Sequence, residues 1–314
     1  MKRSLVVVLV CALLLAVPAS AHVNHATAPP QQSADGTVVV ETAFIAVDGW
    51  AVVHTDANGK PGEPIGHTAL AGEGGLETDV RVTIDDAVWS EWEGARDVWV
   101  VLHRDDGDGV FEPDEDNPLS NFGQPAGERF VLERNATAVV TAAGFAPQRV
   151  TETVRVRTAT LPEAGHLVLH NVSAGERGAV LGVVALSAGT HENVSVPVSG
   201  LPADRATLDA VLYTDDGDGQ FTEADTPVRA GEKAVATRFG VRVLTGDETP
   251  TPTPDESAIV TTATPLPTDF EPPTEAPGDT GTETPTRGTA PGFGVVVAVL
   301  ALLAAVVLAR RRRP

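Results

Sequence analysis

The chain has 314 residues, long enough for two domains, and its 22 Lys+Arg against 43 Asp+Glu give a formal net charge of −21. Removing Lys2, Arg3 and the four arginines at 310–313 leaves 16 basic residues against 43 acidic ones. Such a surface would repel phosphates, which excludes nucleic acid as a partner. It is typical of proteins that work in molar salt, where the Debye length is about 3 Å and long-range self-repulsion is screened.

The chain begins with a predicted secretory signal peptide over residues 1–21. A basic start precedes an apolar run over 5–17, and small residues at 19–21 form the cleavage signal. An uncleaved anchor helix is the alternative, but Pro18 ends the run early. Cleavage would remove Cys11, the only cysteine, so the mature chain would contain no disulfide.

Residues 22–36 are polar and short of core-forming side chains, which predicts a flexible leader. The chain that follows contains an internal repeat, because Gly49–His54 resembles Gly165–His170. The spacing between matching positions starts at 116 and falls to 110 at the second acidic loop, with the order of the matches preserved. This pattern indicates a duplicated domain, and we expect repeat 1 over 37–148 and repeat 2 over 149–245.

Each repeat has the pattern of a β-domain. Short β-branched runs at 38–40, 80–84 and 98–102 are separated by Gly, Asp, Asn and Pro. The segment 194–198 alternates between apolar and polar residues, and Pro197 within it favours an edge strand. The sequence therefore predicts an all-β fold of two tandem immunoglobulin-like β-sandwich domains.

An acidic loop, Asp-Asp-Gly-Asp-Gly followed by an aromatic residue within two positions, occurs at 105–109 and again at 215–219. Calcium requires six to eight oxygen ligands from a flexible loop, so we compared both loops with the twelve-residue helix–loop–helix calcium motif. The ligands expected from that spacing are Asp106, Asp108, Val110 through its carbonyl, and Glu115, and then Asp216, Asp218, Gln220 and Asp225.

The match to the calcium motif is incomplete. The first ligand position is Arg104 in one copy and Thr214 in the other, and Asp105 and Asp215 come one residue late. An ordinary glycine-rich turn on an acidic protein is the alternative. Retention of the motif in both copies favours calcium as the cofactor.

The histidines suggest one competing function. His54 and His170 occupy matching strand ends in different repeats, where a capping role is expected. Cleavage would expose His22 as the N-terminal residue, and an N-terminal His can chelate copper with its amine and ring, assisted here by His25. The alternative function is therefore an extracytoplasmic copper-binding carrier.

Three sequons predict N-glycosylation at Asn135, Asn171 and Asn193. The mature chain contains no cysteine, no Gly-x-Ser-x-Gly, no His-Glu-x-x-His and no phosphate-binding loop motif. We therefore expect no enzymatic activity.

The C-terminal part has two segments. Residues 246–290 are rich in Thr and Pro, which predicts an extended stalk open to O-glycosylation. Residues 291–314 contain Pro291, Gly292 and Phe293, an apolar run over 295–309 and an arginine cluster. The fifteen apolar residues span about 22 Å as a helix, whereas a bilayer core is about 30 Å thick. This length favours a sorting signal over a permanent transmembrane helix, and an ordinary single-span anchor is the alternative.

The tail resembles the PGF-CTERM signal of haloarchaeal surface proteins, and the repeats resemble an uncharacterised tandem domain common in such proteins. The resemblance implies processing by an archaeosortase, a membrane anchor through a prenyl-derived lipid or the C-terminal helix, and a place on the extracellular face of the membrane. It implies no known activity. We expect a structural or adhesive protein of the envelope, with calcium stiffening the acidic loops and the S-layer glycoprotein as a candidate partner.

Overall fold

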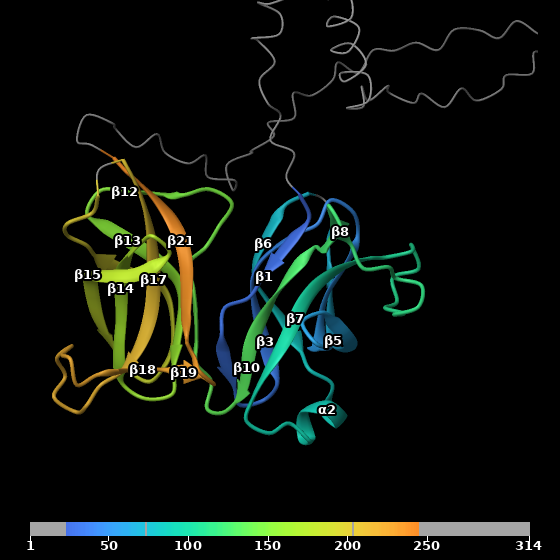
Figure 1. Cartoon of the computed structure of the whole chain (residues 1–314), viewed down its shortest axis with the longest axis horizontal. Coiled ribbons are helices and arrows are strands. Elements are labelled where there is room, and N and C mark those ends of the chain that lie inside the picture. Colours follow the sequence, from blue (N-terminus) through green and yellow to red (C-terminus); the bar gives the residue numbers. More distant parts are fainter. Residues whose placement is uncertain (1–22, 73, 203, 245–314) are drawn as a thin grey trace, which may run out of the picture. The chain divides into compact units, whose positions relative to one another are not determined.

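The computed structural model of the chain describes residues 23–72, 74–202 and 204–244, all within one compact unit. In these ranges the regular secondary structure is almost entirely strand, with one short helix, α2 (Asp86–Ser90). The strands form two tandem sandwiches of matching topology (Figure 1). We call them copy 1 (residues 23–135) and copy 2 (136–244). The predicted fold class is confirmed.

Copy 1 packs a three-stranded sheet on a five-stranded sheet. The smaller sheet has the order β1 (His25–Thr27), β3 (Thr37–Phe44), β6 (Leu76–Thr83). The larger sheet has the order β2 (Gln31–Ser33), β10 (Gly127–Arg134), β7 (Ala95–Arg104), β4 (Gly49–Asp56), β5 (Pro61–Leu70). A small hairpin joins β8 (Ser120–Asn121) to β9 (Gln124–Pro125).

Copy 2 repeats this arrangement. Its smaller sheet has the order β11 (Val139–Thr141), β13 (Thr153–Leu161), β16 (Gly189–Pro197). Its larger sheet has the order β12 (Gln148–Val150), β21 (Ala236–Val243), β17 (Arg205–Thr214), β14 (Gly165–Ser173), β15 (Glu176–Leu186), with β18 (Thr226–Pro227) paired to β17. A hairpin joins β19 (Arg229–Ala230) to β20 (Lys233–Ala234). The strand that contains Pro197, β16, lies at a sheet edge as predicted.

Each sandwich has its own core. In copy 1 the alternating residues Val38 and Val40 of β3 pack in one cluster with Ala51 and Val53 of β4. In copy 2 the matching positions are Val154, Val156, Leu167 and Leu169. Because successive side chains of a strand point to opposite faces, this alternation leaves the intervening residues free to face outward.

The predicted flexible leader over 22–36 is wrong for its described residues, which contain two strands. β1 pairs with β3, and β2 runs parallel to β10. The Gln31 side chain explains why a polar segment is ordered: its Nε2 donates to the Val39 carbonyl at 2.9 Å and its Oε1 accepts from the Val39 amide at 2.8 Å. Gln148 makes the same pair of bonds with the Arg155 backbone in copy 2. In each copy a glutamine side chain thus makes the pair of hydrogen bonds that the backbone of a neighbouring strand would otherwise make.

The predicted boundary between the repeats, at 148 and 149, is also displaced. β11 already belongs to the smaller sheet of copy 2, where Val139 pairs with Thr160. The displacement has the same cause as the missed leader, because the first two strands of each sandwich are only three residues long and carry little apolar periodicity.

The copies meet at Glu41, an outward-facing residue of β3 that is 4% exposed. Its Oε1 accepts hydrogen bonds from the amides of Ala142 and Ala143 at 2.7 and 2.8 Å. The Thr237 hydroxyl also donates to this carboxylate, at 2.7 Å. A buried carboxylate of copy 1 therefore receives its hydrogen bonds from copy 2.

Arg157 occupies the position in β13 that matches Glu41 in β3, and it also crosses between the copies. Its guanidinium donates to the Glu41 carbonyl at 3.0 Å and pairs with Asp79 of copy 1 at 3.0 Å. A further bond runs from Arg157 to the carbonyl of Ala143. The two matching positions thus contribute opposite charges to one junction.

Candidate cation-binding loops

In each copy the acidic loop packs on the outer face of the larger sheet. In copy 1, Trp50 of β4 lies opposite His103 of β7, and Phe111 from the loop packs on both rings. In copy 2, His166 lies opposite Tyr213, and Phe221 packs on these. The aromatic residue that follows each acidic motif therefore anchors the loop to the sheet.

A buried aspartate fixes the backbone of each loop. Asp116, 1% exposed, accepts from the amides of Asp106 and Glu112 at 3.0 and 2.9 Å. Asp225, 7% exposed, accepts from Asp216 and Thr222 at 3.0 and 2.7 Å. These bonds lower the pKa of the Asp225 carboxyl, the Thr222 amide contributing most. Both copies therefore use the same two hydrogen bonds to hold the loop, although the copy 2 loop is one residue shorter before its buried aspartate.

The remaining aspartates of each motif converge near the surface. Carboxylate oxygens of Asp105, Asp106 and Asp108 lie within 4.8 Å of one another, and so do those of Asp215, Asp216 and Asp218. Asp105 accepts from the amides of Gly107 and Gly109, both of which have positive φ, at 115° and 73°. Glycine relieves the strain of these two turns, which is why the motif alternates Asp with Gly.

The carboxylates of the copy 1 loop repel one another. The pKa of Glu112 is raised, chiefly by the charge of Glu115 and then by that of Asp108. A bound divalent cation would relieve this repulsion, and clustered carboxylates are the ligands that calcium prefers.

The predicted ligand sets are only partly brought together. Asp106 and Asp108 converge with Asp105, and Asp216 and Asp218 converge with Asp215, so the aspartates that come one residue late in the helical motif belong to the clusters. Val110 is 57% exposed, and Gln220 is exposed. Glu115 is exposed, and Asp116 instead matches Asp225. Glu115 lies outside the aspartate cluster because this loop follows the strand β7 and does not adopt the helical motif's spacing.

The matching histidines have structural partners. His54 Nδ1 lies 2.9 Å from the Gly62 carbonyl and His170 Nδ1 lies 3.2 Å from the Gly178 carbonyl, across the bulged hairpin of each copy. Their Nε2 atoms meet His103 at 3.0 Å and the Tyr213 hydroxyl at 3.1 Å. Burial lowers the pKa of His54 and lowers that of His103 to about 4. Both rings are therefore neutral at pH 7.

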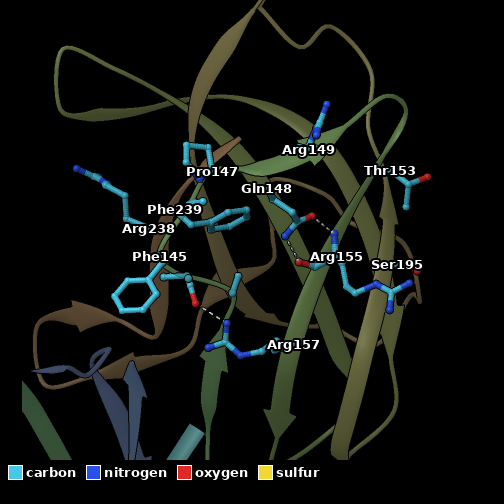
Figure 2. Close-up of a pocket in the computed structure, with 15 residues that line it drawn as sticks. Phe145, Pro147, Gln148, Arg149, Thr153, Arg155, Arg157, Ser195, Arg238 and Phe239 are labelled. Atoms are coloured by element: carbon cyan, nitrogen blue, oxygen red, sulfur yellow. Dashed lines mark hydrogen bonds between the residues drawn. The ribbon is translucent and has the colours of Figure 1, made fainter. Parts of the chain in front are cut away.

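A recess of about 760 Å³ lies beside the segment that links β11 to β12 (Figure 2). Arg157 and Arg238 border it and are paired with Asp79 and Asp209. Arg149 and Arg155 add further positive charge to its lining. These arginines are a local exception on an acidic protein and could accept an anionic group.

The sequons lie at different depths. Asn135 and Asn193 are exposed, the latter with a φ of 53°, whereas Asn171 is half-buried within β14. Glycosylation stays a prediction at all three. His25 lies in β1, where its ring packs on Phe44 and Phe145 and its Nδ1 lies 3.0 Å from the Val23 carbonyl.

Several predicted segments lie outside the described residues. They are the signal peptide, His22, the Thr/Pro-rich stalk, and the tail with Pro291, Gly292 and Phe293. Within the described ranges, no helix is long and apolar enough to cross a bilayer.

Two comparisons with known families match the chain. Residues 24–131 and 141–242 match a family described as a domain of unknown function (DUF7282), once for each copy. Residues 290–312 match the PGF-CTERM motif, a signal for archaeosortase processing and membrane anchoring that marks exported proteins held at the cell surface. No curated protein matches the chain.

Proposed function

Because the chain belongs to the DUF7282 family and ends in the sorting signal of an anchored surface protein, we propose that its paired sandwiches serve a structural or adhesive role in the cell envelope. The junction at Glu41 and Arg157 supports this role, since a spacer must hold its modules at a fixed angle. The S-layer glycoprotein is the proposed neighbour, and binding rather than catalysis is the proposed activity.

Calcium is the proposed cofactor of the loops. The observation that carries this part is the duplicated cluster of three aspartate oxygens within 4.8 Å, held in both copies by the same hydrogen bonds to a buried aspartate. Calcium would bridge carboxylates that otherwise repel one another and would stiffen the loop around them. The acidic clusters at the surface would then bind ions rather than a macromolecule directly.

Thermal melts of the full chain in molar KCl, with calcium added after chelation, test this proposal. At a calcium concentration a hundred times Kd, each occupied site should add about 2.7 kcal/mol to the free energy of unfolding. Asp108→Asn and Asp218→Asn should each remove part of the gain. Asp114→Asn is the matched control, because Asp114 is an exposed carboxylate of the same loop outside the cluster. An equal loss in Asp114→Asn, or no gain with calcium, would refute the calcium proposal.

A further inference from the structure

One buried histidine of copy 2 lacks hydrogen-bond partners. His166 of β14 is 2% exposed, and neither its Nδ1 nor its Nε2 has a hydrogen-bond partner. Unsatisfied buried polar atoms are costly, so each requires an explanation.

Two carboxylates face this ring. His166 Nε2 lies 3.8 Å from Asp215 Oδ1 and 3.9 Å from Asp225 Oδ2. The Asp225 side chain is fully buried and the Asp215 side chain is 16% exposed. Asp225 is fixed by the amides of Asp216 and Thr222, and Phe221 packs against the imidazole. The three groups are thus held around one point by the sheet and the loop.

We propose that His166, Asp215 and Asp225 bind a divalent transition-metal ion of the zinc class. Zinc binds nitrogen and carboxylate oxygen at about 2.0–2.2 Å, so two such ligand atoms lie about 3.4 Å apart at the tetrahedral angle and up to about 4.3 Å apart at wider angles. The separations of 3.8 and 3.9 Å fit an ion between the atoms. Three protein ligands leave a fourth tetrahedral position for water or another ligand.

The same separations argue against a direct contact between the ring and the carboxylates. Nitrogen–oxygen hydrogen bonds are about 2.7–3.2 Å long, so neither aspartate is close enough to accept a proton from His166. The mixed donor set also separates this site from the exposed aspartate clusters, because calcium takes oxygen ligands and imidazole suits zinc. Asp215 belongs to both groupings, whereas His166 belongs to this one alone.

Copy 1 provides a natural comparison. Asp105 and Asp116 match Asp215 and Asp225, but Trp50 stands at the position of His166. An indole offers no lone pair to a metal. The proposed ion therefore binds to copy 2 only, which predicts one site per chain.

The test uses the full chain in molar KCl after chelation. Calorimetric titration with Zn²⁺ alone should give one ion per chain, and Co²⁺ should bind at the same site with visible absorption that Zn²⁺ abolishes. His166→Trp should abolish binding, and the fold should accept it since copy 1 carries Trp at this position. Asp215→Asn, at a less buried ligand, should weaken binding by about a hundredfold or more, since loss of an outer-shell partner alone costs about 10–100-fold.

His191→Ala is the matched control, because this partly exposed histidine of copy 2 is bonded to the Ser187 carbonyl, away from the site. His191→Ala should bind Zn²⁺ as the unchanged chain does. Absence of a zinc site, or zinc affinity that is unchanged in both His166→Trp and Asp215→Asn, would overturn the proposal. His166→Trp should retain the calcium response that depends on Asp108, so failure of either proposal can be recognised separately.

Discussion

Replacing Glu41 by alanine should uncouple the two sandwiches. The substitution removes the acceptor of the Ala142 amide and of the Thr237 hydroxyl, both in buried residues, and of the partly exposed Ala143 amide. A buried donor without an acceptor costs about 1–3 kcal/mol. The two buried donors thus give a loss of about 2–6 kcal/mol, a large share of the 5–15 kcal/mol that stabilises a typical domain.

Urea denaturation can resolve the uncoupling because the tryptophans are unevenly placed. All four tryptophans lie in copy 1, at positions 50, 89, 92 and 99, so their fluorescence reports that copy alone. Far-ultraviolet circular dichroism reports both copies. We expect the two signals to change together in the unchanged chain and to separate in Glu41→Ala.

Glu41→Gln keeps one carbonyl acceptor and loses the charge and the second acceptor oxygen, so its loss of stability should be smaller than in Glu41→Ala, about 1–2 kcal/mol. Glu152→Ala, at an exposed residue, should stay within about 0.5 kcal/mol of the unchanged chain. Coincident fluorescence and dichroism transitions with an unshifted midpoint in Glu41→Ala would refute the reasoning.

Two further predictions concern single positions. Burial raises the pKa of Glu128 to about 7, so its stabilising contribution is complete below the ordinary value of 4.5 and is lost as the pH rises through about 7. Glu128→Gln should remove this loss and be the more stable form above pH 7, as measured by urea midpoints across pH; parallel curves for both forms would contradict the assigned cause. Trp50→His should give copy 1 the ligand that it lacks and raise Zn²⁺ binding from one ion to two per chain, as measured by calorimetry; a count that stays at one would show that Asp105 and Asp116 are not placed to complete the site.

The strands that fill the cores could be predicted from sequence because they are short runs rich in β-branched residues, bounded by turn-forming residues. Residues 38–40 give such a run in β3, and Val80 and Val82 give β6 a period of two. The first two strands of each copy could not be found in this way, since β2 is Gln-Gln-Ser and depends on a side-chain amide. The sequence does contain a signal for these short strands, because Gln31 precedes β3 and Gln148 precedes β13 by similar numbers of residues.

The candidate sites were harder to predict because their residues come from distant segments. The acidic motif marked the loop that holds the aspartate cluster, but the spacing of a helical motif selected the exposed Glu115, whereas the structure buries Asp116. His166 is about fifty residues from its carboxylate partners, and only the strand register brings it opposite Tyr213 and next to Asp215. The exchange of Trp50 for His166 at matching positions was visible in the repeat and could have identified the site.

The opposite charges at positions 41 and 157 affect which copies of the domain can pack against each other. Two modules of the first kind would bring carboxylate against carboxylate, and two of the second kind would bring guanidinium against guanidinium. The charge of each copy at this position therefore complements the other copy and would repel a second copy of its own kind. Divergence at this one outward position therefore favours packing of the two unlike copies over packing of two alike copies.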